Sequence, residues 1–387
     1  MIEPANIEEC AAELARAARD RLRVSFIGGG SALDFGNPGP QPDLQLCTRR
    51  LDRVIDYAPE DQVIVAEAGV TLARLAELAA PNAQWFGVDA PHRERATLGG
   101  LVAAGAFGPR RVRYGGVREL LLGLALVRAD GAVANSGSKV VKNVAGFDLP
   151  KVICGSLGTL GLVARVTLRL HPAPEASHTR IVLGASSAEV VDAARTLRRA
   201  QLEPSSVVAL RRGAGRFDLG VRFEGFERGV RRDVERFIEK LPGARHAGPD
   251  PASSESFWRD HEAARTDGDL RVRVAALPTH FGDVESLLEP LLGSLERPRL
   301  AWYATLGLGF ASGQLTSDAR ALEALTLARN GLTRRGGSLV VEAAPRALRL
   351  AFDAFGPLPS AFGVMQELKQ RFDPERRLNT GRFVGGL

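Results

Sequence analysis

The residues with the clearest chemical potential in this chain are glycines grouped in short loops. The first group, GGGS at residues 28–31, directly follows the apolar run LRVSFI. Consecutive glycines can direct several backbone N–H groups at one point, and such a nest binds phosphate oxygens. The spacing is not a Rossmann fingerprint, because Leu33 stands where a GxGxxG motif starting at Gly28 needs its last glycine. A plain turn is the alternative for this loop.

Three further glycine-rich segments follow in the first half of the chain. Residues 96–105 (ATLGGLVAAG) place two adjacent glycines at the start of a helix of small residues. An anion at the helix N-terminus or a closely packed neighbouring helix would each account for them. Residues 139–149 read KVVKNVAGFDL, and residues 155–163 read GSLGTLGLV. We expect all four loops to converge on one long, flat, anionic ligand.

Arginines offer a second kind of chemistry, the binding of carboxylates. Arg110, Arg111 and Arg113 follow the second glycine group and could clamp a substrate carboxylate. An exposed basic patch or a subunit contact is the interpretation that we favour for them. The sequence shows no Ser/His/Asp or nucleophilic cysteine constellation, so no catalytic residue is assigned.

The composition excludes several classes of protein. Cys10, Cys47 and Cys154 are isolated, so the sequence offers no zinc or iron–sulfur spacing, and we expect no metal and a reducing compartment. The net charge is +6, but basic residues are mixed with acidic ones and aromatics make up only 6%. We therefore expect no nucleic-acid partner. No signal peptide is visible, and no apolar run approaches the ~18–20 residues of a membrane span.

Local patterns predict the elements that must position the loops. An amphipathic helix is expected at residues 5–20, short strands at 22–27, 44–48 and 53–57, and a hairpin at 121–135 around the Asp130–Gly131 turn. The sequence HPAP at residues 171–174 indicates a domain boundary. Beyond it, strands near 179–184, 206–211, 217–223, 270–276, 299–306 and 337–343 alternate with helices near 187–200, 226–240, 281–296 and 317–335, before a last helix at 360–372. This alternation is typical of an α+β layer.

The order GGGS, ATLGG, KNVAGFDL, GSLGTLGLV and LNTGRF resembles the vanillyl-alcohol-oxidase-type (PCMH-type) FAD-binding flavoproteins. Within them it is most similar to the FAD-binding subunits (E subunits) of bacterial glycolate oxidase. The resemblance is specific over residues 22–174 and returns at 371–383. It implies an α+β fold with a PCMH-type FAD-binding domain of two α/β lobes at residues 1–174. An α/β cap domain at 175–370 and a tail at 371–387 that returns to the flavin would follow.

The same resemblance implies which residues bind FAD. Gly28, Gly29, Gly30, Ser31 and Ala32 would cradle the pyrophosphate. Seven further loop positions would contact the cofactor. Thr97, Gly99, Gly100 and Gly105 would line its phosphate and ribityl side, and Gly155, Gly161 and Val163 would fit against the ring and ribityl chain. Lys142, Asn143, Gly146 and Asp148 would form the loop near the flavin, and Asn379 would reach the isoalloxazine edge. For Lys142 a solvated charge is the alternative, and for Asp148 a local cap or salt bridge.

The resemblance further implies noncovalent FAD, because Ser31 stands where some relatives carry a histidine that bonds the cofactor. Larger catalytic relatives carry a paired-histidine metal site in an HxGDGN context. Here His280 begins HFGDVE, which we interpret as a helix start.

The implied function is that of the FAD-binding subunit of a glycolate oxidase complex, which oxidises the small 2-hydroxy acid glycolate to glyoxylate. Its partners would be a larger FAD-containing subunit and an iron–sulfur subunit. We expect a cytoplasmic flavoprotein oxidoreductase that reaches the inner face of the cell membrane only through its partners. A stand-alone FAD-dependent 2-hydroxy-acid dehydrogenase and a non-catalytic structural subunit are the alternatives. UDP-N-acetylenolpyruvoylglucosamine reductase shares the FAD-domain type, but KNVAGFDL and LNTGRF fit it poorly.

Overall fold

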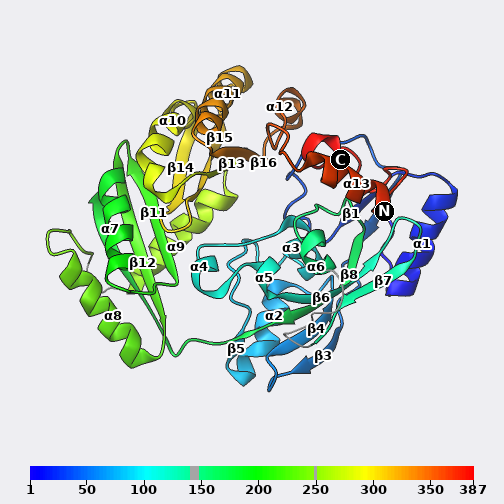
Figure 1. The fold of residues 1–387 in the computed structure, drawn as a ribbon, viewed down its shortest axis with the longest axis horizontal. Coiled ribbons are helices and arrows are strands. Elements are labelled where there is room, and N and C mark those ends of the chain that lie inside the picture. The colour runs from blue at the N-terminus through cyan, green and yellow to red at the C-terminus, as the bar shows by residue number, and fades with distance from the viewer. Residues whose placement is uncertain (140–147, 248–250) are drawn as a thin grey trace. The chain divides into compact units, whose positions relative to one another are not determined.

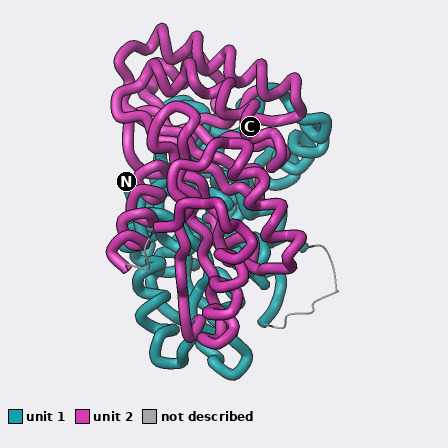
Figure 2. Tube along the Cα trace, turned by 90° about the vertical axis from the view of Figure 1, so that its left-hand side faces the viewer, with its two compact units in different colours: residues 1–108, 114–173, 357–387 teal, residues 109–113, 174–356 magenta. Residues whose placement is uncertain are grey.

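A computed structural model describes residues 1–139, 148–247 and 251–387, which form two compact units (Figures 1 and 2). Unit 1 comprises Met1–Gly108, Tyr114–Ala173 and Pro357–Leu387, and unit 2 comprises Pro109–Arg113 and Pro174–Gly356. The chain therefore leaves unit 1 after the HPAP segment and returns to it for its last residues. Unit 2 ends before residue 370, the end of the cap domain expected from the sequence, because helix α13 (Phe362–Phe372) is grouped with unit 1.

The first lobe of unit 1 is built on helix α1 (Ile7–Arg19), which packs beside the parallel strands β1 (Val24–Ile27) and β2 (Leu44–Cys47). Asn6 caps the helix by accepting the Glu9 N–H at 2.8 Å. Cys10, Leu14 and Ala17 recur at helical spacing and are fully buried. Their apolar cluster also contains Leu378, so the C-terminal segment is part of this lobe.

The second lobe of unit 1 contains an antiparallel sheet with the strand order β3-β4-β8-β6-β7 in the described residues. The predicted hairpin is present as β6 (Leu121–Val127) and β7 (Val133–Gly137). The other strands are β3 (Val54–Ala58), β4 (Val63–Glu67) and β8 (Leu162–Arg169), with the short pair β5 (Gln84–Trp85) and β9 (His171–Pro172). The helices are α2 (Leu72–Ala79), η1 (Ala80–Asn82), α3 (Leu98–Ala104), α5 (Val117–Leu120), α6 (Leu149–Ile153) and, near the C-terminus, η3 (Val384–Gly386).

Unit 2 is an antiparallel sheet with the order β10-β12-β11-β14-β15-β13-β16. Its strands are β10 (Ala176–Ala185), β11 (Ser206–Gly213), β12 (Arg216–Gly225), β13 (Leu270–Ala275), β14 (Leu295–Tyr303), β15 (Leu308–Leu315) and β16 (Ser338–Ala343). Its helices are α7 (Ser187–Arg199), α8 (Glu227–Lys240), α9 (Pro251–Thr266), η2 (Pro278–His280), α10 (Phe281–Gly293), α11 (Asp318–Arg334) and α12 (Arg346–Ala351), while α4 (Arg111–Tyr114) begins in this unit.

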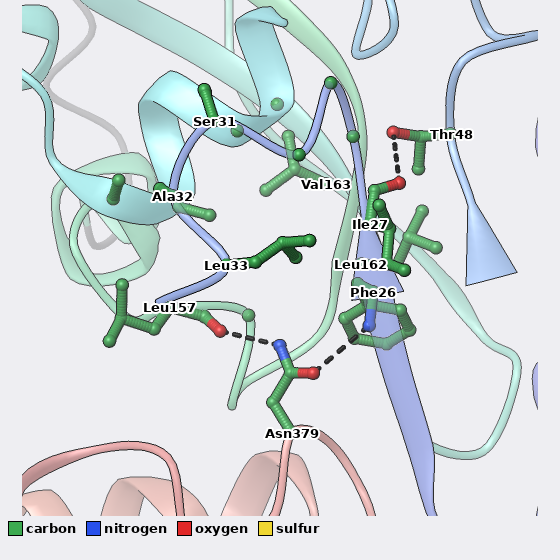
Figure 3. Close-up of a pocket in the computed structure, with 18 of the residues that line it drawn as sticks. Phe26, Ile27, Ser31, Ala32, Leu33, Thr48, Leu157, Leu162, Val163 and Asn379 are labelled. Carbon is green, nitrogen blue, oxygen red and sulfur yellow. Dashed lines mark hydrogen bonds between the residues drawn. The ribbon is translucent and has the colours of Figure 1, made fainter. Parts of the chain in front are cut away.

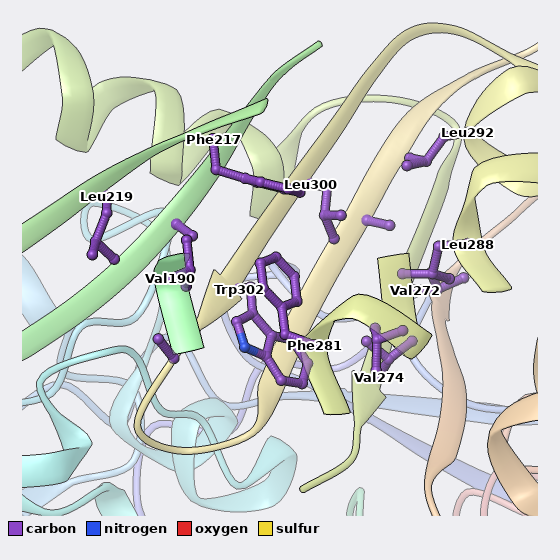
Figure 4. Packing of buried hydrophobic residues seen from close by; sticks show 14 of the residues in the cluster. Val190, Phe217, Leu219, Val272, Val274, Phe281, Leu288, Leu292, Leu300 and Trp302 are labelled. Carbon is purple, nitrogen blue, oxygen red and sulfur yellow. The ribbon is translucent and has the colours of Figure 1, made fainter. Parts of the chain in front are cut away.

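The two faces of the unit 2 sheet differ in character. One face packs against α7, α8, α10 and α11 in a large apolar core, in which Trp302 stacks on Phe281 with ring centroids 5.0 Å apart (Figure 4). Helix α9 lies on the opposite face, because Phe257 approaches Gly220, whereas the neighbouring Leu219 points into the core. The prediction of an α+β fold is confirmed, although α9 and β15 were not anticipated.

Candidate functional site

A pocket in unit 1 brings together several of the predicted glycine loops (Figure 3). It encloses about 670 Å³ of empty space, including its open mouth. Of the predicted site residues, it is lined by Gly28, Gly29, Gly30, Ser31, Ala32, Gly99, Gly100, Gly161, Val163 and Asn379.

The GGGS loop presents unpaired backbone donors. The N–H groups of residues 29–32 donate no hydrogen bond to any residue that the structure describes. Gly30 has φ +73°, and a Cβ placed there would have only the Leu33 Cδ1 nearby, at 3.7 Å. A run of free N–H groups beside open space can accept a phosphate or another anion.

Packing within the protein accounts for other glycines of the pocket. A Cβ at Gly29 would lie 1.4 Å from the Arg95 carbonyl oxygen, and a Cβ at Gly99 would lie 2.7 Å from the Ala68 Cβ. These distances are far below van der Waals contact. Gly29 and Gly99 therefore allow loops to meet each other, whatever ligand the pocket takes.

The start of α3 has its own protein acceptors. The Leu98 N–H donates to the Val70 carbonyl at 2.9 Å, and the Gly99 N–H donates to the Ala68 carbonyl at 2.8 Å. The Gly100 N–H reaches the Oγ1 of Thr97, the N-cap residue, at 3.4 Å. This helix end packs against residues 68–70, which belong to no helix, so the structure confirms neither sequence interpretation of ATLGG, an anion at the helix N-terminus or a neighbouring helix. Thr97 lies behind the GGGS loop and lines a neighbouring hollow.

The fourth loop forms another wall of the pocket. Leu157 adopts φ +53° and donates its N–H to the Ala103 carbonyl at 2.8 Å, which ties the loop to α3. Gly161 has φ +155°, and a Cβ there would meet the Leu126 Cγ at 2.8 Å. Gly105 and Gly155 adopt positive φ and adjoin one another, with a Cβ at Gly105 3.2 Å from the Gly155 Cα, but neither lines the pocket.

Asn379 joins three segments at the edge of the pocket (Figure 3). Its Oδ1 accepts the Phe26 N–H at 3.1 Å, and its Nδ2 donates to the Leu157 carbonyl at 2.7 Å. Its backbone N–H donates to the Val24 carbonyl at 2.8 Å. A Cβ at Gly158 would lie 2.6 Å from the Asn379 Nδ2, so these hydrogen bonds of Asn379 require glycine at position 158.

The remaining predicted residues belong to the third glycine-rich segment, residues 139–149. Lys142, Asn143 and Gly146 lie outside the described residues. Asp148 is exposed at the N-cap position of α6, and its side chain makes no capping hydrogen bond. Its assignment to the flavin loop stays a prediction.

Sequence reasoning missed several pocket residues. Arg382 lies inside the LNTGRF motif, which could have singled it out, and its guanidinium binds the carbonyl groups of Ala32 and Phe35, just after the GGGS loop. Apolar and small side chains gave no comparable signal, because in sequence they resemble any core residue. This group comprises Phe26, Ile27, Leu33, Ala103, Ala104, Leu157 and Leu162, and Thr48 and Gly158 were missed with them.

Arg110 is a structural arginine of unit 2. Its guanidinium binds both carboxylate oxygens of Glu224, with Nη2 2.6 Å from Oε1 and Nε 3.0 Å from Oε2. Glu224 is buried and also accepts the Ser177 hydroxyl at 3.1 Å. Burial alone would raise the pKa of Glu224, but Arg110, together with Ser205 and Arg222, outweighs burial and holds that pKa below its ordinary value. Arg110 thus clamps a carboxylate of its own chain and forms no exposed basic patch.

Two kinds of feature are absent from the part of the chain that the structure describes. No three histidine, cysteine or acidic side chains come together as a metal site there. In the same part of the chain, every helix is too short or too polar to cross a lipid bilayer.

Comparison with known proteins identifies the family. Residues 1–137 match the FAD binding domain family. The glycolate oxidase subunit GlcE of Escherichia coli is 31% identical over 381 residues, which cover 96% of this chain and 95% of that protein. D-lactate dehydrogenase of Archaeoglobus fulgidus is 34% identical over 172 residues, 44% of this chain, and the match spans only 38% of that longer enzyme.

Solved structures agree at the level of fold. A structure of alkyldihydroxyacetonephosphate synthase superimposes with a TM-score of 0.72 over 97% of this chain and 76% of that chain, at 18% sequence identity. At this identity the likeness shows the fold alone. The near-complete match to GlcE shows the family, and the sequence-based prediction of it is confirmed. The chain belongs to the PCMH-type FAD-binding flavoproteins, in the branch that includes the glycolate oxidase subunit GlcE.

Proposed function

We propose that this chain is the FAD-binding subunit of a complex that oxidises glycolate to glyoxylate. The observation that carries the proposal is the alignment with E. coli GlcE along almost the full length of both chains. Matches to the D-lactate and D-2-hydroxyglutarate dehydrogenases cover about half of this chain and are consistent with the same substrate class, 2-hydroxy acids.

The pocket of unit 1 suits FAD in its chemistry. The free N–H groups of residues 29–32 can receive the pyrophosphate, and the apolar side chains of Leu33, Leu157 and Val163 offer a surface for a flat ring. Bound there, FAD would supply the two-electron redox chemistry, while the protein supplies binding and orientation. Position 31, where some relatives carry a histidine bonded to the flavin, is a serine in this chain. This residue supports noncovalent binding of FAD.

Two partners complete the proposal. A match of 28% identity to the glycolate oxidase subunit GlcD of Bacillus subtilis covers 47% of this chain and 39% of that protein. A larger flavoprotein subunit of this kind would be one partner. The isolated cysteines of this chain supply no iron–sulfur spacing, so an iron–sulfur subunit would be the other partner and would carry electrons onward. We propose that this chain supports catalysis by the complex, at the inner face of the membrane through these partners.

Anaerobic titration of the purified chain tests the proposal. A flavin absorption spectrum that neither glycolate nor D-lactate bleaches, together with bleaching by glycolate after addition of the partner subunits, is the expected result. Rapid bleaching in the isolated chain would favour a stand-alone dehydrogenase. A colourless chain that binds no added FAD would favour a structural subunit, and either result would overturn the proposal.

A further inference from the structure

The C-terminal segment, residues 369–387, contacts two walls of the pocket that are far away in sequence. Asn379 and Arg382 line the pocket, and both hold backbone groups of its loops. This segment belongs to unit 1 although all of unit 2 precedes it in the chain. The shape of the pocket therefore depends on residues that follow all of unit 2 in the chain.

Arg382 binds carbonyl groups of the residues that directly follow the GGGS loop. Its Nη2 donates to the Ala32 carbonyl at 2.6 Å and to the Leu33 carbonyl at 3.3 Å, and its Nε donates to the Phe35 carbonyl at 2.9 Å. The C=O and N–H of a trans peptide point in opposite directions. Fixing these carbonyl groups therefore fixes the peptides that join residues 32–33, 33–34 and 35–36. These peptides follow the free N–H groups of residues 29–32 directly, so they hold the end of the loop in place. The same guanidinium also places a permanent positive charge at the pocket.

A buried ion pair anchors the segment to the opposite loop. The Lys369 Nζ donates to the Asp373 Oδ2 at 2.8 Å, to the Thr159 carbonyl at 2.8 Å and to the Leu378 carbonyl at 3.1 Å. The Asp373 Oδ2 also accepts the Leu378 N–H at 2.8 Å. Both charged side chains are almost fully buried, so the pair is shielded from solvent screening. This anchor fixes the start of the segment, and Asn379 fixes its middle.

We propose that Arg382 is a cofactor-positioning residue: it holds the GGGS loop in the shape that binds the pyrophosphate, with its own position set by the Lys369 and Asn379 anchors. The proposal rests on the proposed binding of FAD in this pocket. It assigns to the tail a role in affinity for the phosphate end of the cofactor, in addition to any contact with the flavin ring. Loss of Arg382 frees the three carbonyl groups that follow the GGGS loop and removes a positive charge, while the apolar cores stay intact.

The test compares Arg382→Ala with Arg371→Ala in the full chain. Arg371 lies exposed on α13, does not line the pocket, and its removal changes the net charge equally. Affinity for FAD is measured by quenching of flavin fluorescence in the apoprotein, and exchange of backbone amides with deuterium is followed in residues 28–35. We expect Arg382→Ala to raise the Kd for FAD at least tenfold over Arg371→Ala and to speed exchange in the loop, with cooperative unfolding preserved.

Arg382→Lys separates the effect of the arginine's hydrogen bonds from the effect of its charge. It also provides a second variant in case Arg382→Ala does not fold. A lysine keeps the charge but loses the planar fork of donors. We expect it to bind FAD at least threefold more weakly than the wild type. A Kd within twofold of the Arg371→Ala value for whichever of the two variants folds would overturn the proposal. If the wild-type chain itself binds no FAD, the proposed function fails. If the wild type binds FAD and the variants bind it as tightly as Arg371→Ala, only the role of Arg382 fails, so the two failures can be told apart.

Discussion

Replacing Arg110 with methionine should destabilise unit 2, because it would leave the carboxylate of Glu224 buried without its cationic partner. The Glu224 side chain is 1% exposed, and the Arg110 side chain is 19% exposed. Breaking a buried ion pair by removing one partner costs about 3–5 kcal/mol. We therefore expect Arg110→Met to lower the free energy of unfolding by about this amount at neutral pH.

The pH dependence of this loss has a definite sign. In the wild type the pKa of Glu224 is below its ordinary value, so its contribution to stability is complete above the unfolded-state pKa and is lost as pH falls through the folded-state pKa. In Arg110→Met, only Ser205 and Arg222 would oppose the effect of burial, so the pKa of Glu224 would rise relative to the wild type. The carboxyl group of the variant would then bind a proton as the pH falls, which relieves the penalty. The difference between the two proteins should shrink between pH 7.5 and pH 4.5.

Urea unfolding followed by tryptophan fluorescence measures this difference, since Trp258 and Trp302 lie in unit 2. Glu224→Gln in the Arg110→Met background removes the buried charge and should recover roughly 1–3 kcal/mol. A loss below about 1 kcal/mol at pH 7.5 would refute the reasoning, since that is the range of a surface ion pair. An equal loss at both pH values would refute the assignment to Glu224.

Two further substitutions follow from packing distances. Gly29→Ala would place a methyl group 1.4 Å from the Arg95 carbonyl oxygen and displace the GGGS loop, so the Kd for FAD should rise at least tenfold in fluorescence titrations. Its control is Gly229→Ala on α8, which has open space around it and should leave FAD affinity unchanged; equal effects would contradict the reasoning. Trp302→Ala should lower the free energy of unfolding by about 3–5 kcal/mol in urea. Trp302→Phe should cost less than half as much, because a ring still stacks on Phe281; equal losses would count against the stacking.

Elements with local signals were predictable from the sequence. The helix expected at residues 5–20 is α1, because the Asn6 cap and the spacing of its apolar residues are encoded within one segment. The hairpin around Asp130–Gly131 formed for a similar reason: Gly131 has φ +83°, and the Asp130 side chain accepts the Ala132 N–H at 3.0 Å. Neither element depends on distant residues for its identity.

Strand β15 could not be predicted from its own residues. It contains Gly309 and Gly313, which weaken the strand signal. Its environment explains both glycines: a Cβ at Gly309 would lie 2.9 Å from the Trp302 ring, and one at Gly313 would lie 2.9 Å from the Leu295 Cβ. Pairing with β13 and β14 on both sides makes the segment a strand.

The candidate site likewise combines features that the sequence predicts with features that it does not. The glycine loops were visible in the sequence, and the structure brings several of them to one pocket. What each glycine does was not visible. Gly29 meets the backbone of residue 95 and Gly99 meets Ala68, whereas Gly30 faces open space. The contact of Arg382 with Ala32 joins residues 350 positions apart, which no local pattern reveals.

The most direct test of the account is a crystal structure of the purified chain reconstituted with FAD. The account predicts density for the dinucleotide in the pocket of unit 1, with its pyrophosphate against the N–H groups of residues 29–32 and no covalent bond to the protein. Density at another place, or a pocket that stays empty at saturating FAD, would contradict it.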